Sequence, residues 1–134
     1  MKQITFITGN KGKFEEAQKI FSGSEIELLQ ESYDTPEIQS EDTKEIAQFS
    51  AKYVGSELRK PLFVMDRGFY IEGLNGFPGP FIKYINNWLA PEQVLSLLGD
   101  NKNRKACWVT SIGIYIPRGS SENIYRNRSR QCSV

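Results

Sequence analysis

Short apolar runs alternate with segments of helical periodicity along the first two-thirds of the chain, and this alternation constrains the fold more than any other feature. Runs at residues 3–8, 26–29 and 62–65 have the length and composition of buried strands. The segments between them, from residue 11 and from residue 42, place apolar side chains three or four positions apart, as on one face of a helix. This order predicts an α/β protein with a mixed β-sheet flanked by helices.

The rest of the chain contains turn formers, two short helices and further strand formers. Asp66-Arg67-Gly68 is expected to form a tight turn after the third strand, and helices are expected at about 81–89 and 91–98. Residues 106–116 are rich in strand-forming side chains. Residues 123–128 either pair with them as a hairpin or, as the favoured interpretation, fray with the arginine-rich tail over 122–134. We expect one domain over residues 1–134.

The composition narrows the chemistry that is available. The 134 residues carry a net charge of +1 and include no histidine, which excludes Ser-His-Asp and Cys-His catalytic units and histidine metal sites. A charge near zero predicts no nucleic-acid partner, and no apolar run is long enough to span a membrane. Cys107 and Cys132 predict neither a disulfide framework nor a close metal pair, so a cytoplasmic location is expected.

The junction between the first strand and the first helix is the first candidate site. It combines two glycines, a hydroxyl, an amide and two lysines, in the order Thr8, Gly9, Asn10, Lys11, Gly12 and Lys13. Free backbone N–H groups and the helix dipole favour an anion at such a junction. It is not a Walker A loop, because the glycines are three apart and no Ser or Thr follows Lys13. From these residues alone, a phosphate site and an Asn-capped helix with solvated lysines are equally compatible.

Two carboxylates and a further lysine are the other candidates. Asp66 follows an apolar strand, and ligands of α/β sheets gather at the C-terminal ends of strands. A carboxylate there suits Mg²⁺, although an aspartate that caps its own turn is an equal alternative. Glu37 lies in a polar loop and, taken alone, is expected to be an exposed acid. The turn-rich segment 74–83 ends in Lys83 and, taken alone, is expected to be a rigid connection.

Taken together and in order, four segments are similar to those of the inosine/xanthosine triphosphate pyrophosphatase family, enzymes that act on noncanonical purine nucleotides. The segments are residues 6–16, 36–39, 64–66 and 74–83, and the most specific is Gly76-Phe77-Pro78-Gly79-Pro80-Phe81-Ile82-Lys83. The similarity covers about residues 3–116. The resemblance implies Mg²⁺-dependent hydrolysis of a nucleoside triphosphate to the monophosphate and pyrophosphate. It also implies a homodimer.

The same resemblance implies a role for each matching residue. Mg²⁺ would be held by Glu37 and Asp66, and Asp66 would also orient or deprotonate the attacking water. Lys13 and Asp66 would be the catalytic residues. The polyphosphate would be bound by Thr8, Gly9, Asn10, Lys11, Lys13 and Lys83.

The chain also departs from the family pattern. Met65 stands where the family usually has an acid, which should weaken metal binding. Arg67 is a second departure, and it is expected to pair with Asp66 or with phosphate. The family's later base-recognition segments, including a Ser-His-Arg motif, have no counterpart, so a C-terminally shortened domain is expected. Two alternatives to an enzyme follow: a degenerate nucleotide- or phosphate-binding module without turnover, and a truncated product whose fold depends on a partner.

Overall fold

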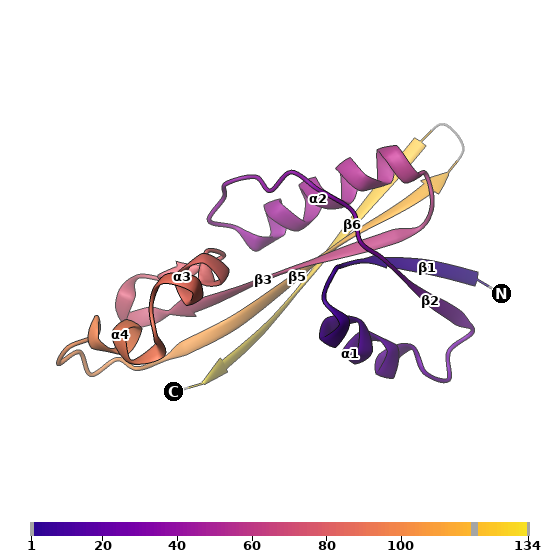
Figure 1. Cartoon of the computed structure of the whole chain (residues 1–134). Coiled ribbons are helices and arrows are strands. Elements are labelled where there is room, and N and C mark those ends of the chain that lie inside the picture. Colours follow the sequence, from indigo (N-terminus) through magenta and orange to yellow (C-terminus); the bar gives the residue numbers. More distant parts are fainter. Residues whose placement is uncertain (1, 119–120, 134) are drawn as a thin grey trace.

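The computed structural model describes the backbone of residues 2–118 and 121–133, which form an elongated molecule around one sheet (Figure 1). The predicted mixed α/β architecture is confirmed. The elements in chain order are β1 (Lys2–Ile7), α1 (Lys11–Phe21), β2 (Ile26–Glu31), α2 (Thr43–Leu58), β3 (Leu62–Ile71), the 3-10 turn η1 (Glu72–Leu74), β4 (Pro78–Gly79), α3 (Ile82–Trp88), α4 (Pro91–Ser96), β5 (Ala106–Arg118) and β6 (Ser121–Ser133).

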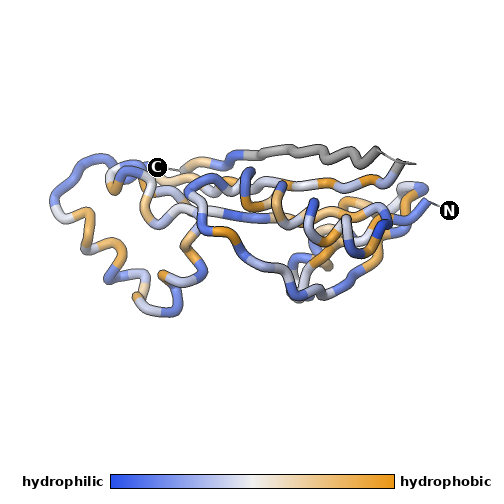
Figure 2. Tube along the Cα trace, turned by 90° about the horizontal axis from the view of Figure 1, so that it is seen from above, coloured by the Kyte–Doolittle hydropathy of each residue, from blue (hydrophilic) through white to orange (hydrophobic). Residues whose placement is uncertain are grey.

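The six-stranded sheet has the order β2-β1-β3-β5-β6, and β4 pairs separately with β3. The strand β1 is parallel to β2 and β3, whereas β5 runs antiparallel to β3 and β6. Figure 1 shows α2 above the strands and α1 below them, so the two helices cover opposite faces. Seen from above in Figure 2, the segment with α3 and α4 extends from the end of the sheet farthest from the N-terminus.

Each face of the sheet has its own hydrophobic core. On the α2 side the buried residues are Ile7, Ala47, Ala51, Val54, Leu62, Val64 and Tyr115. On the α1 side they are Phe6, Ala17 and Phe63, and the rings of Phe6 and Phe63 stack with centroids 4.4 Å apart. Along β3, even-numbered residues therefore face α2 and odd-numbered residues face α1, as the two-residue period of a strand requires.

Helix α2 begins at Thr43, within the segment from residue 42 whose apolar periodicity predicts a helix. Asp42 is its N-cap and accepts a hydrogen bond from the backbone N–H of Lys44 at 3.0 Å. The backbone N–H of Asp42 donates to Ser40 Oγ at 3.1 Å, and this hydroxyl donates to Glu45 at 2.6 Å. Ser40 thus links the cap to Glu45, and the end of the loop that carries Glu37 is anchored to the helix.

The predicted tight turn at Asp66-Arg67-Gly68 is wrong, because β3 continues through these residues. Strand β5 pairs with all ten residues of β3, from Leu62 opposite Tyr115 to Ile71 opposite Ala106. Such long-range pairing overrides the local turn preference of Asp and Gly, because every residue of β3 gains a cross-strand partner.

Two expectations about the C-terminal part are also corrected. The segment expected to fray forms β6, which pairs with β5 from Ser121 to Ser133. Cys107 and Cys132, for which no disulfide was expected, lie opposite each other on β5 and β6 and form a disulfide bond. Their separation of 25 residues in the sequence conceals this proximity, which the hairpin creates. Within the described residues, no helix has the length and apolar character that crossing a membrane requires.

Candidate active site

The candidate site lies where β1 ends and β3 continues. Phe6 of β1 pairs with Phe63 of β3, and β1 ends one residue later, at Ile7. Asp66 is therefore beyond the end of β1 and next to the loop that leads from β1 into α1. Because β1 no longer pairs with β3 beyond this point, polar side chains from the neighbouring loops can approach the edge of β3. A cavity of about 1210 Å³ opens at this point.

The cavity brings together most of the residues predicted from the sequence. Lys11 differs from the others: it is exposed on the first turn of α1 and is not among the described residues that line the cavity. The predicted residues that do line it are Thr8, Gly9, Asn10, Lys13, Glu37, Asp66 and Lys83. Residues from four separate segments therefore face one space, which is what the binding of a single extended ligand requires.

Local hydrogen bonds order the loop between β1 and α1. Thr8 Oγ1 accepts from the backbone N–H of Asn10 at 3.1 Å, and Asn10 Oδ1 accepts from the backbone N–H of Lys13 at 3.1 Å. The side chain of Gln30 donates to the carbonyl oxygen of Thr8 at 3.1 Å. Asn10 is thus the N-cap of α1, as one interpretation of the sequence expects, and the same loop also borders the cavity.

Asp66 is the most electrostatically perturbed carboxylate of the site. Burial is the main cause that raises its pKa from 3.8 to about 6, and the negative charge of Glu37 raises it further. Lys13 and the backbone N–H of Arg67 oppose this rise. Among the described residues, nothing donates a hydrogen bond to the buried Oδ2 atom of Asp66. A half-buried carboxylate with an unpartnered oxygen and a pKa near neutrality is suited to accept a proton or to bind a cation.

Lys13 is the second perturbed group. Burial lowers the pKa of its amine, as do the positive charges of Arg67 and Lys83, whereas Asp66 and Glu16 oppose the change. A half-buried ammonium near other cations is less well solvated than it is in water, and Asp66 and Glu16 supply only part of the counter-charge that would balance it. An anionic ligand in the cavity would supply that counter-charge.

Glu37 is held by two residues of α3, which also lines the cavity. It accepts a hydrogen bond from the hydroxyl of Tyr84 at 2.9 Å, and the ammonium of Lys83 lies 3.9 Å from its other oxygen. Sequence reasoning missed Tyr84. Its only local signal was its place beside Lys83, because the contact joins residues 47 positions apart.

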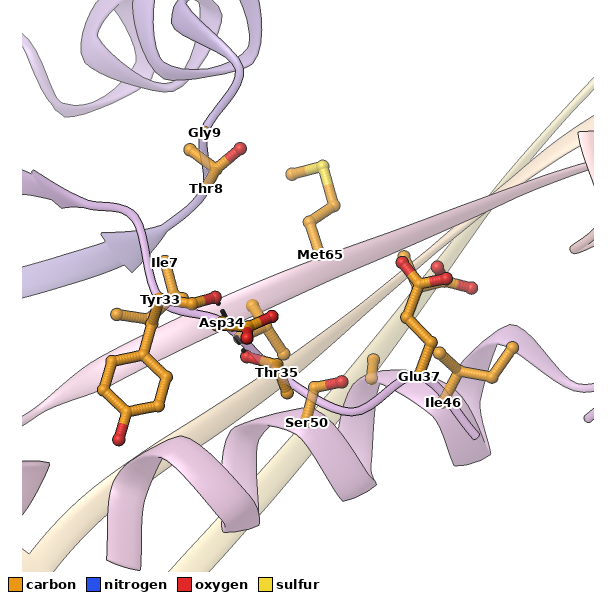
Figure 3. A pocket seen from close by; sticks show the side chains of 13 residues that line it. Ile7, Thr8, Gly9, Tyr33, Asp34, Thr35, Glu37, Ile46, Ser50 and Met65 are labelled. Atoms are coloured by element: carbon orange, nitrogen blue, oxygen red, sulfur yellow. Dashed lines mark hydrogen bonds between the residues drawn. The ribbon is translucent and has the colours of Figure 1, made fainter. Parts of the chain in front are cut away.

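A smaller cavity of about 300 Å³ adjoins the first on the α2 side of the sheet (Figure 3). It shares Thr8, Gly9, Glu37, Met65 and Asp66 with the larger cavity. Its other walls include Tyr33, Asp34, Thr35 and Ser50, which sequence reasoning did not select because they lie in a polar loop or on α2. Figure 3 shows Thr8, Met65 and Glu37 around the strand where the two cavities meet.

The two departures from the family pattern lie on the α1 side of β3. Met65 packs against the core of Phe6 and Phe63. The guanidinium of Arg67 does not pair with Asp66 among the described residues. Its Nε donates to Thr110 Oγ1 at 3.2 Å and its Cζ lies 5.9 Å from the centre of the Trp108 ring. The expected Arg67–Asp66 pair is thus not formed, because consecutive strand residues point to opposite faces.

The donor set at Asp66 fits a magnesium ion that keeps much of its water shell. Oδ2 of Asp66 accepts no hydrogen bond from the described residues, and Glu37 lines the same two cavities and raises the pKa of Asp66. The described residues contain no group of three or more acidic, histidine or cysteine side chains that could surround a metal. Mg²⁺ does not require such a cage, because it is commonly bound by one or two carboxylates, water and substrate phosphates.

The fold and the cavity together define an α/β protein in which a strand–helix junction and a strand-borne acid line the same cavity. The family model described as the Ham1 family matches residues 4–130, and the chain belongs to this family. The resemblance that the four sequence segments indicated is thereby confirmed.

Curated relatives agree with this assignment, and solved structures show a similar fold. The chain is 40% identical over 117 residues to proteins named dITP/XTP pyrophosphatase from Methanopyrus kandleri and from Methanosarcina mazei. The matched regions cover 87% of this chain but 62% and 64% of those relatives. The fold is similar to that of a HAM1 protein from Coxiella burnetii, with a TM-score of 0.76, 22% identity, and coverage of 97% of this chain and 72% of that one.

Proposed function

We propose that the protein is a Mg²⁺-dependent nucleoside triphosphate pyrophosphatase that acts on noncanonical purine nucleotides. The observation that carries the proposal is the half-buried Asp66, with an unpartnered oxygen, in the same cavity as the Thr8–Asn10 loop, Lys13 and Lys83. The names of the curated relatives support it. The chain spans about three-fifths of their length, so activity, substrate and partners belong to the proposal.

The residues of the cavity would have different roles in hydrolysis. The Thr8–Asn10 loop, Lys13 and Lys83 would bind the triphosphate, mainly through positive charge and backbone N–H groups. Asp66 would orient a water molecule and accept its proton as the water oxygen bonds to the α-phosphorus. The bond from that phosphorus to the bridging oxygen would break, and pyrophosphate would leave. Lys13, which lines the same cavity, would stabilise the charge that develops. A magnesium ion held by Asp66 and Glu37 would neutralise phosphate charge.

A homodimer is a further part of the proposal, and it rests on the family resemblance. The cytoplasmic location was expected from the cysteine usage alone. The Cys107–Cys132 disulfide removes the support that cysteine usage gave to a reducing compartment.

A binding module without turnover is the alternative that a specific observation favours. Met65 supplies no carboxylate at the site, and Glu37 already contacts Tyr84 and Lys83. Fewer free oxygen ligands weaken a Mg²⁺ site, and a weakly held metal would leave the phosphates bound but not cleaved.

A pyrophosphate-release assay tests the proposal. Inosine, xanthosine and standard purine triphosphates would be compared with Mg²⁺ and with EDTA, for the native protein and for the Asp66→Asn and Glu37→Gln variants. Asp100→Asn, at an exposed position in a turn, is the matched control. We expect Mg²⁺-dependent release that falls by about a hundredfold or more in Asp66→Asn, the scale of a lost acid–base group. Calorimetric binding of inosine triphosphate with no release above the Asp66→Asn level would instead establish the binding module.

A further inference from the structure

Three cationic side chains line the large cavity, and two of them form no ion pair within 4.0 Å with a carboxylate of the described residues. Lys83 lies 3.9 Å from Glu37, which partly neutralises it. For Lys13 and Arg67, the described residues provide no ion pair within 4.0 Å. Both line the same cavity, and Arg67 is close enough to lower the pKa of Lys13. Two adjacent cations repel each other, so their arrangement is favourable when an anion binds between them.

Arg67 is oriented by contacts that leave most of its hydrogen-bonding capacity unused. Thr110 accepts from Nε at 3.2 Å, and the Trp108 ring lies beneath the guanidinium at 5.9 Å. Across the described part of the chain, no acceptor contacts the two Nη groups. Because the ring and the hydroxyl hold the planar group in place, little side-chain freedom is lost when a ligand binds. The free pair of Nη groups matches the bidentate geometry of a phosphate.

The position of Arg67 along β3 places it beside the reacting groups. It follows Asp66 directly, and both residues line the cavity at the level where β1 has ended. Because β1 no longer covers this part of β3, a ligand that crosses the strand edge can reach Asp66 from the α2 side and Arg67 from the α1 side. An extended polyphosphate would contact Arg67 directly, while its reacting phosphate would lie beside the water molecule or metal ion at Asp66.

We propose that Arg67 is a phosphate-binding residue that, together with Lys13, positions the polyphosphate of the substrate. This proposal rests on the proposed function for the identity of the ligand. In its bound state, Arg67 keeps its contacts with Thr110 and Trp108 and donates both Nη groups to phosphate oxygens. A purely structural Arg67 would make the same two protein contacts but would have no effect on anion binding.

Calorimetric binding of inorganic triphosphate, without hydrolysis, is the test. The native protein would be compared with Arg67→Gln, which removes both the charge and the paired Nη groups, and with Arg67→Lys, which keeps only the charge. Lys52→Gln is the matched control, because Lys52 is an exposed cation on α2 and does not line either cavity. We expect the dissociation constant to rise about tenfold to a hundredfold in Arg67→Gln, less in Arg67→Lys, and about twofold or less in the control, as hydrogen bonds to charged groups imply.

Fluorescence gives a second readout that does not depend on the folding of the Arg67 variants. In a Trp88→Phe background, Trp108 is the one remaining tryptophan, and its emission should change when triphosphate binds beside Arg67. Equal affinities for Arg67→Gln and Lys52→Gln would overturn the proposal, as would unchanged Trp108 emission at saturating triphosphate or no triphosphate binding by the native protein. Triphosphate binding that depends on Arg67 without any nucleotide hydrolysis would overturn the proposed function and leave this inference intact.

Discussion

Replacing Asp66 with asparagine should stabilise the protein above about pH 6 while removing its proposed activity. The carboxyl group has a pKa of about 6 in the folded protein, against an ordinary value of 3.8. Each pKa unit corresponds to about 1.4 kcal/mol, so ionised Asp66 costs the folded state on the order of 3 kcal/mol. Partial exposure to solvent screens the charge, so we expect Asp66→Asn to raise the measured free energy of unfolding by about 2 kcal/mol. An amide of the same shape avoids this cost, because it has no charge to desolvate.

The pH dependence follows from the direction of the shift. Because the pKa of Asp66 is higher in the folded state, the folded protein binds the extra proton between about pH 4 and pH 6. The contribution of Asp66 to the free energy of unfolding of the native protein should therefore fall as the pH rises through this window, and it should be constant above it. The Asp66→Asn variant lacks this contribution, so the difference between the two proteins should be small near pH 4 and reach about 2 kcal/mol near pH 7.5.

Urea denaturation, followed by circular dichroism in EDTA at several pH values, measures this difference. Asp100→Asn serves as the control, because it removes an exposed carboxylate far from the cavity. Adding Mg²⁺ near pH 7.5 should stabilise the native protein and not the Asp66→Asn variant, since only the carboxylate gains a cation. A stability difference that stays constant between pH 4 and pH 7.5 would refute the argument that burial of the charge is its cause.

Two predictions concern stability elsewhere in the sheet. Gly113→Ala should destabilise the protein by about 2–4 kcal/mol in the same urea assay, because the added Cβ would overlap the backbone carbonyl of Ala47 in α2; a loss below about 0.5 kcal/mol would show that α2 can move away freely. Cys132→Ser should lower the free energy of unfolding by about 2–4 kcal/mol, since the bond to Cys107 spans 25 residues. Reducing agent should lower the free energy of unfolding of the native protein to that of Cys132→Ser and should leave the variant unchanged. An effect of reducing agent on the variant would contradict this reasoning.

Local sequence pattern predicted those elements whose signals lie within a single segment. The helical periodicity from residue 11 and from residue 42 predicts α1 and α2, which begin at Lys11 and Thr43. Two strand expectations and the expectation about the cysteines failed or fell short because their causes are distant. The ten-residue length of β3, the pairing of β6 and the disulfide all depend on β5 as a common partner, which no local pattern reveals.

In the candidate site, too, local sequence segments predicted some residues, whereas others depend on contacts between distant parts of the chain. The ordered set of segments pointed to residues that the structure brings into one cavity, although Lys11 lies outside it, and their chemical roles stay predictions. The side chains that hold the site together could not be found in this way. The contact of Tyr84 with Glu37 and that of Trp108 with Arg67 join elements far apart in sequence, and a lone tyrosine or tryptophan is compatible with many other positions.

The ladder between β3 and β5 determines more than the length of these strands. It pairs Asp66 with Ser111 and Arg67 with Thr110, and the alternation of the strand then assigns the acid to one face and the guanidinium to the other. A slip of one residue in this ladder would exchange the two faces: the arginine would lie against α2 and the carboxylate beside Trp108. The backbone register of β3 thus determines which face of the sheet carries each charge of the site. Deletion of Met65 should therefore abolish the charge pattern of the site, although every charged residue is retained.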